Sequence, residues 1–273
     1  MEQQSAATTA EVPVFIRVPQ SLGRPVIRML RHVGRFGMMI QELFRALPEW
    51  RQWFPNAVAQ CFAVGYGSLF IVLLTAGFAG AVTSLQAGYQ FTGSVPLYVM
   101  GGVVTESIIL ELGPVLSGLI LAGRIGARYA AELGTMRVTE QIDALEALGR
   151  NPVSYLLLPR VMAGILMIPA LVMMANLMGL LSGYVAAKSA LGITTADFVF
   201  GTRYFFKSFD LWYSLIKAEV FGLVVTLIPC YVGFTTTSGA EGVGRAATTA
   251  VVISSVGILL LDTLLAKLLL PGA

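Results

Sequence analysis

The chain has 273 residues, of which 56% are hydrophobic and 12% are charged, about half of the roughly 25% charged residues of an average soluble domain. This composition excludes an ordinary soluble protein and predicts an integral membrane protein. The formal net charge of +3 is too small to indicate a nucleic-acid partner, and we expect none. The two cysteines, Cys61 and Cys230, lie far apart in hydrophobic segments, so no disulfide framework is expected.

The amino-terminal region is expected to have two parts. Residues 1–20 are predicted to be a polar disordered tail, because the first dozen residues lack the continuous apolar run of a signal peptide. Residues 21–56 are predicted to form an amphipathic helix and a linker, with apolar residues on one face at ~100° per residue. The opposite face carries Arg24, Arg28, Arg31 and Arg35. A basic amphipathic helix typically lies in the headgroup layer; the alternative is packing on a soluble partner.

Five hydrophobic stretches follow, and each is long enough to cross a bilayer. The hydrocarbon core, about 30 Å thick, requires ~20 apolar residues in a helix. The stretches cover approximately residues 60–86, 98–124, 154–186, 211–234 and 246–269. We therefore expect an all-α membrane domain over residues 57–273, with five transmembrane helices preceded by the interfacial helix.

The basic residues predict the orientation of these spans. If the amino terminus is cytoplasmic, thirteen of the 18 Lys and Arg residues fall on the cytoplasmic side. The other five are Lys188, Arg203, Lys207, Lys217 and Lys267. This asymmetry follows the positive-inside rule. It places the loop between the second and third spans in the cytoplasm and the aromatic segment 187–210 on the periplasmic side, where aromatic residues usually anchor a protein at the membrane interface.

The cytoplasmic segment 132–149, "ELGTMRVTEQIDALEALG", is the most charged stretch of the membrane domain. Gly134 is expected to weaken the preceding helix, and Gly149 followed by Pro152 is a stop signal, so a short separate helix is predicted between them. Its apolar residues Val138, Ile142 and Leu145 share one face. This helix is either a lid on the ends of its own spans or a docking element for a cytoplasmic partner.

Charged residues within the spans need an explanation, because charge is unfavourable in the bilayer core. Glu111 lies near the middle of the second span, beside Pro114, which is expected to kink the helix. A carboxylate at a kink suggests a cavity. Counting residues from the outer ends of the spans favours Glu106 or Asp262 over Glu111 as the partner of Lys217. The alternative for all four is structural ion pairing within the bundle.

Small residues recur every fourth position along the second span. They are Gly118, Ala122, Gly126 and Ala130. Such stripes allow helix backbones to approach closely. The spacing alone fits packing within one chain or between two copies.

Two longer stretches carry a family resemblance. Residues 111–164, "ELGPVLSGLILAGRIGARYAAELGTMRVTEQIDALEALGRNPVSYLLLPRVMAG", and residues 233–255, "GFTTTSGAEGVGRAATTAVVISS", resemble the MlaE/YrbE family of permease subunits of MCE-type ABC transporters. The resemblance implies a homodimeric permease in the bacterial inner membrane, bound to a cytoplasmic ABC ATPase dimer and to a hexameric MCE-domain protein on the periplasmic side. Such a complex moves phospholipid or another lipid between the inner and outer membranes.

The resemblance also implies roles for individual residues. By this resemblance, residues 132–149 are expected to form the coupling helix, and loop 235–245 is expected to lie near the ATPase interface. The implied coupling residues are Glu132, Met136, Arg137, Glu140, Ile142, Asp143, Leu145, Glu146 and Glu241. The implied substrate-cavity residues are Glu111, Lys217, Glu106, Asp262, Leu112 and Pro114. Many relatives carry Arg immediately before the glutamate, whereas this chain has Leu110.

The sequence contains no G-x-x-x-x-G-K-[ST] loop of the kind that binds nucleotide phosphates. We therefore expect no cofactor or metal in this chain, with ATP and Mg bound by the partner ATPase. An intramembrane serine hydrolase built on "GYGS" at 65–68 would need an activating base that the spans do not offer. A self-contained carrier or channel is the remaining alternative to a non-enzymatic transport subunit, and we find neither an inverted repeat nor a line of ionisable residues.

Overall fold

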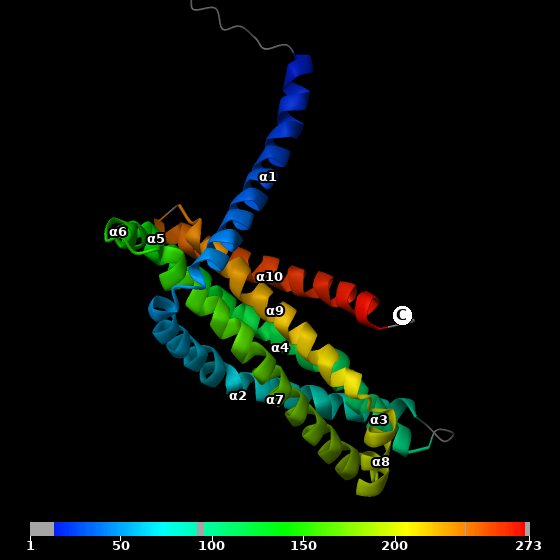
Figure 1. Cartoon of the computed structure of the whole chain (residues 1–273). Helices are drawn as coiled ribbons and strands as arrows, with labels where there is room; N and C mark the ends of the chain where they lie inside the picture. The colour runs from blue at the N-terminus through cyan, green and yellow to red at the C-terminus, as the bar shows by residue number, and fades with distance from the viewer. Residues whose placement is uncertain (1–13, 92–95, 238, 271–273) are drawn as a thin grey trace, which may run out of the picture. The chain divides into compact units, whose positions relative to one another are not determined.

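The computed structural model describes residues 14–91, 96–237 and 239–270. Within these ranges every regular element is a helix (Figure 1). The chain divides into two compact units, residues 1–45 and 46–273.

In its described residues the first unit is formed by helix α1, Val14–Ala46, of which the last residue belongs to the second unit. It begins before residue 21, so the prediction of a tail extending to residue 20 is wrong for residues 14–20. Residues 14–18, Val-Phe-Ile-Arg-Val, are mostly apolar and therefore lack the composition of a solvated tail. The rest of the predicted tail, 1–13, lies outside the described residues. The apolar side chains of Ile27, Leu30 and Val33 remain exposed on α1, and the interfacial position of this helix stays a prediction.

The second unit contains five helical segments that are long and apolar enough to cross a membrane, which confirms the expected number. They are Trp50–Gln90, Tyr98–Val138, Val153–Leu191, Ser208–Phe234 and Gly239–Leu269. Each is longer than the hydrophobic stretch that predicts it, because polar residues at the ends continue the helix. The first of these segments, α2, starts at Trp50, inside the stretch predicted as a linker.

The second and third of these segments contain π-helical turns. The second comprises α3 (Tyr98–Glu106), η1 (Ser107–Leu112), α4 (Gly113–Leu121), η2 (Ala122–Gly126) and α5 (Ala127–Val138). The third comprises η3 (Val153–Leu157) and α7 (Leu158–Leu191). A π-turn changes which side chains share a face, and such turns are frequent at functional sites.

Helices α2 and α7 lie side by side over much of their length (Figure 1). A Cβ atom on Gly80 would overlap the backbone of Gly179, so the two helices touch through glycine. The hydroxyl of Ser84 donates to the carbonyl of Gly183 at 2.7 Å, and that of Ser182 donates to the carbonyl of Gly77 at 2.6 Å. Small residues and interhelical hydrogen bonds hold this pair together, as is typical in membranes.

The small-residue stripe of the second span packs against α9 (Ser208–Phe234) of the same chain. A Cβ atom on Gly126 would lie 3.1 Å from the Pro229 ring, and one on Gly118 would lie 3.3 Å from the Phe221 ring. Ala122 and Ala130 are fully buried. Of the two interpretations of this spacing, the structure therefore favours packing within one chain.

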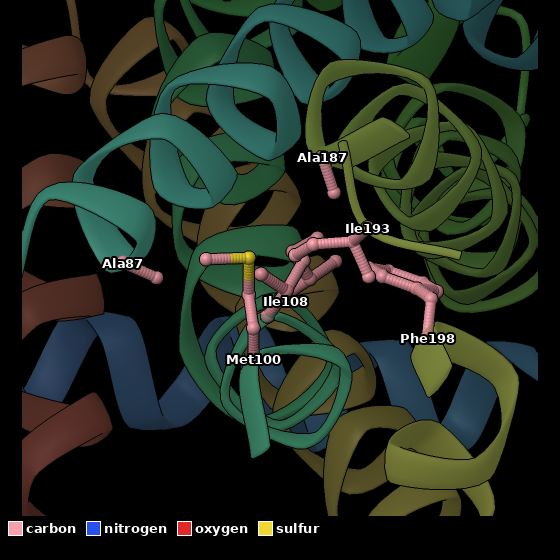
Figure 2. Packing of buried hydrophobic residues seen from close by; sticks show 7 residues of the cluster. Ala87, Met100, Ile108, Ala187, Ile193 and Phe198 are labelled. Carbon is pink, nitrogen blue, oxygen red and sulfur yellow. The ribbon is translucent and has the colours of Figure 1, made fainter. Parts of the chain in front are cut away.

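At the end of the long helices opposite α6 (Gln141–Ala147), helix α8 (Thr195–Phe205) packs on α3 (Figure 1). Figure 2 shows the apolar cluster there, in which Met100, Ile108 and Phe198 meet. Thr194 caps α8 by accepting a hydrogen bond from the N–H of Asp197 at 3.2 Å. Segment 187–210, predicted to lie outside the membrane, is thus largely helical and packed on its own bundle.

At the other end, the predicted separate helix over 132–149 is wrong in its first half. The second span continues through Gly134 as α5 and ends at Val138. Gly134 does not weaken this helix but serves close packing, since a Cβ atom there would lie 3.3 Å from the hydroxyl of Thr236. The break occurs at Glu140, which has a left-handed φ of 60°. Only α6 is separate, and Gly149 follows it with a φ of 74°, in the role that the sequence predicts.

Candidate functional site

Lys217 is the centre of a charged cluster inside the helix bundle. Its side chain extends from α9 and is 0% exposed. Its Nζ donates a hydrogen bond to Glu111 Oε2 at 2.8 Å and forms an ion pair with Asp262 Oδ1 at 2.5 Å. The same Nζ lies 5.0 Å from the centre of the Tyr213 ring. The cluster joins η1, α9 and α10 (Gly239–Leu269).

The second hydrogen bond of Lys217 depends on a local property of the sequence. In a regular α-helix the carbonyl of Leu110 would accept from the N–H of residue 114, but Pro114 has no N–H. Lys217 Nζ donates to this Leu110 carbonyl at 2.9 Å. Pro114 therefore takes part in the cluster indirectly, by leaving a carbonyl for the lysine.

A buried ammonium group is strongly unfavourable unless it is paired and hydrogen-bonded. Lys217 meets this requirement with a carboxyl group, a carbonyl and a second carboxyl group around its three donors. The two acids are not equally buried, because the Asp262 side chain is 19% exposed and that of Glu111 is 47% exposed. The cluster is thus closed on the lysine side and open at Glu111.

Counting residues from the outer ends of the spans predicts the pairing with Lys217 correctly for Asp262 but not for Glu111 or Glu106. Asp262 pairs with Lys217 as the count favours, but Glu111 does so as well, although the count ranked it last. Glu106 forms no ion pair with Lys217 among the described residues. The count assumes straight, parallel α-helices, whereas η1 adds a π-turn at Glu111 and lysine has a long flexible side chain.

Sequence reasoning missed a polar layer beside the cluster. Asn176 on α7 is buried and donates a hydrogen bond from Nδ2 to the hydroxyl of Ser214 at 2.9 Å. A Cβ atom on Gly113 would overlap Asn176 Oδ1, so α4 and α7 are in close contact here. An asparagine within the apolar run "LVMMANLMG" is a signal that could have identified it, because polar residues are rare in spans.

The predicted coupling segment contains a second charged cluster, built around Glu132 on α5. Glu132 accepts hydrogen bonds from Arg128 Nε at 2.6 Å and from Arg160 Nη2 at 3.1 Å. Arg160 is buried, donates to the carbonyl of Leu156 at 2.7 Å and lies over the Tyr129 ring. Glu132 therefore links the second and third spans of this chain, rather than presenting a free carboxylate to a partner.

Helix α6 has one inward and one outward face. Ile142 is fully buried, so it anchors α6 on its own bundle as the lid interpretation expects. Asp143 accepts a hydrogen bond from Arg137 Nη1 at 2.5 Å, which ties α6 to α5. The outward face carries exposed Glu140 and Glu146 and, directly after the helix, exposed Leu148.

The remaining predicted coupling residues lie close to these elements. Met136 and Leu145 are half-buried on α5 and α6. Glu241 is exposed at the start of α10 and pairs with Arg245 at 3.6 Å.

Both cysteines, Cys61 and Cys230, are free. Among the described residues no group of three or more His, Cys, Asp or Glu side chains could hold a metal ion.

Comparison with known proteins gives consistent results. The sequence profile of the family described as Permease MlaE matches residues 57–268. The chain is 36% identical over 255 residues to a "Probable ABC transporter permease protein" of Rickettsia bellii, covering 93% of this chain and 98% of the relative. It is 33% identical over 261 residues to the intermembrane phospholipid transport system permease protein MlaE of Haemophilus influenzae, covering 94% and 98%. It is 36% identical over 237 residues to the chloroplastic protein TRIGALACTOSYLDIACYLGLYCEROL 1 of Arabidopsis thaliana, covering 87% and 67%.

The matched region contains all five long apolar helices almost completely, together with both charged clusters. The chain is a multi-pass membrane protein and a non-catalytic permease subunit, which implies an ATPase partner. This assignment argues against the self-contained carrier or channel and the intramembrane hydrolase. The chain belongs to the MlaE family of ABC transporter permeases.

Proposed function

We propose that this chain is the permease subunit of an ATP-driven transporter that moves phospholipid between the inner and outer membranes of a bacterium. It lies in the inner membrane with its amino terminus in the cytoplasm. It works as a homodimer with a cytoplasmic ATPase dimer and a hexameric MCE-domain protein on the periplasmic side. Support for this cargo comes from the name of the Haemophilus influenzae relative, an intermembrane phospholipid transport permease, and from the cluster around Lys217.

The half-exposed carboxyl group of Glu111 is the observation that carries the proposal. A carboxyl group open to hydrocarbon is unfavourable, and ionisable groups in spans usually face a bundle interior or a polar cavity. A cavity shared with a second copy of the chain would give Glu111 such surroundings. The lipid headgroup would lie near Glu111 and Lys217, with Glu106, Leu112, Pro114 and Asp262 around it, and the acyl chains would lie against the apolar helices.

A continuous helical path connects this cavity to the proposed ATPase contact. From Glu111 to Val138 the second span runs through α4, η2 and α5, a length of about 40 Å at ~1.5 Å per residue. The Arg137–Asp143 pair joins α6 to the α5 end of this path, and the Glu132–Arg160 pair joins α5 to α7. We propose that ATP-driven closure of the partner moves α6, and that α5 transmits the displacement to the cluster.

Affinity purification tests the assembly. The chain is expressed with its native genomic neighbours, extracted in mild detergent and captured, and the bound proteins and lipids are identified by mass spectrometry. We expect an ATPase, an MCE-domain protein and phospholipid. Replacing exposed Glu146 and Leu148 by Lys and Asp should release the ATPase, whereas Lys267→Ala on α10 should not. Recovery of the chain alone, or lipid transfer that proceeds without ATP, would contradict the proposal.

A further inference from the structure

Two apolar grooves lie on the face formed by α2, α7 and α8, away from the cluster around Lys217. The groove between α7 and α8 has a volume of about 400 Å³ and includes Leu180, Tyr184, Phe198 and Val199 in its lining. The groove between α2 and α7 has a volume of about 450 Å³ and includes Leu74, Phe78, Met178 and Val185. Leu181 lines both grooves, so it forms the ridge between them.

Two basic residues lie beside the groove between α7 and α8. Arg203 on α8 lines the first groove directly. Lys188 on α7 places its Nζ 5.9 Å from the centre of the Tyr184 ring, and Tyr184 lines that groove too. Lys188 also follows Leu181 by seven residues, two helical turns on the same face.

Both basic side chains are exposed, and neither forms an ion pair with a carboxyl group in the described ranges 14–91, 96–237 and 239–270. The acid nearest in sequence to both, Asp197, accepts a hydrogen bond from the hydroxyl of Thr194 at 2.6 Å. Lys188 and Arg203 are therefore two cations beside apolar grooves, at the end of the bundle opposite α6.

We propose that this face binds one diacyl phospholipid, with its phosphate between Lys188 and Arg203 and one acyl chain in each groove, on either side of Leu181. Met178, in the lining of the second groove, precedes Lys188 by ten residues, which is about 15 Å along a helix and half of the ~30 Å hydrocarbon core. The grooves thus match the depth of one leaflet. The two cations match an anionic headgroup, which basic residues at a membrane surface attract.

This site is distinct from the cavity proposed for the transported lipid. The cluster around Lys217 is built by η1, α9 and α10, whereas the grooves are lined by α2, α7 and α8. The site requires only that the long helices lie in a bilayer, and it does not depend on the identity of the transported lipid. The occupant is a lipid of the surrounding leaflet that is held in place by the protein.

Photochemical labelling tests the site. The full chain, purified with its bound partners, is placed in phosphatidylcholine nanodiscs with a trace of phosphatidylglycerol that carries a diazirine on an acyl chain. After irradiation, labelled peptides are mapped by mass spectrometry. We expect labelling concentrated on residues 177–185 of α7 and on α8. It should fall about fivefold for each cation removed in Lys188→Ala and Arg203→Ala, whereas Lys267→Ala, which removes an exposed lysine on α10, should leave it unchanged.

A second variant separates the grooves from the charges. Ala81, which lines the groove between α2 and α7, is replaced by Phe, which fills the groove and leaves both cations in place. We expect Ala81→Phe to abolish labelling in this groove while the helical circular dichroism stays that of the unchanged chain. Equal labelling of all variants would show bulk lipid only and overturn the proposal. Absence of labelling in the assembled complex, with labelling in the isolated chain, would overturn it in favour of a partner's transmembrane helix.

Discussion

The charged cluster around Lys217 and the Arg137–Asp143 pair beside α6 differ in burial, and that difference separates a fixed element from an adjustable one. Lys217 is 0% exposed between two carboxyl groups. At the end that carries α6, Arg137 and Asp143 are 38% and 53% exposed. Removing one partner of a buried pair typically costs about 3–5 kcal/mol, whereas an exposed pair contributes about 0–1 kcal/mol. The Lys217 cluster can fix the helices of the proposed cavity, and the Arg137–Asp143 pair can let α6 move.

The largest expected effect is that of Lys217→Met. It leaves Glu111 and Asp262 without the ammonium group that both contact, so the free energy of unfolding should fall by about 3–5 kcal/mol. Thermal unfolding in detergent, followed by circular dichroism, measures the loss. The triple variant Lys217→Met, Glu111→Gln, Asp262→Asn removes all three charges and should recover most of the stability. An unchanged unfolding temperature for Lys217→Met alone would show that the cluster does not hold the helices together.

A glycine beside the buried cluster should have the next largest effect. Gly113→Ala places a methyl group against Asn176 Oδ1, and overpacking of this kind typically costs about 1–3 kcal/mol. Gly123→Ala on the same span is the matched control, because a Cβ atom there has no neighbour within 4 Å. The unfolding temperature should therefore fall for Gly113→Ala and stay unchanged for Gly123→Ala. Equal effects of the two substitutions would contradict the close contact of α4 with α7.

Glu132→Gln should give an intermediate effect. Buried Arg160 keeps its bond to the Leu156 carbonyl but loses a charged partner, so the expected loss of stability is about 1–3 kcal/mol. We expect the ATPase to be retained in affinity purification, because Glu132 links two spans of this chain. Loss of the ATPase with unchanged unfolding would instead make Glu132 a direct contact.

The smallest effect on stability is expected for Arg137→Ala. Both side chains of its pair with Asp143 are exposed, so the free energy of unfolding should change by less than about 1 kcal/mol. If α6 is the moving element, the same substitution should lower lipid transfer per ATP hydrolysed, since it frees α6 from α5. A double-mutant cycle with Asp143→Ala, read in both stability and transfer, measures the coupling. A large loss of stability would remove the contrast between the Lys217 cluster and the Arg137–Asp143 pair.

The sequence was sufficient for the number of spans and for the residue types of the cluster. Long apolar runs predict helices, and charges within them stand out, which identified Glu111, Lys217 and Asp262. The pairing of Lys217 with Glu111 was harder to predict, because counting residues from the ends of the spans does not include the π-turn at residues 107–112. Gly134 predicts a weakened helix, but tertiary packing against Thr236 overrides its weak helix propensity. The inward direction of Glu132 depends on Arg160, which is 28 residues away and could not be inferred from spacing.

We propose that the open carboxyl group of Glu111 contacts the headgroup of the transported lipid. The direct measurement is ATP-dependent transfer of a fluorescent phospholipid by the reconstituted complex carrying Glu111→Gln, which keeps the size of the side chain and a hydrogen bond to Lys217. We expect intact assembly and ATPase binding, with lipid transfer reduced roughly tenfold, the effect of about 1.4 kcal/mol on a rate. Transfer at the rate of the unchanged complex would contradict the claim and leave the cluster with a purely structural role.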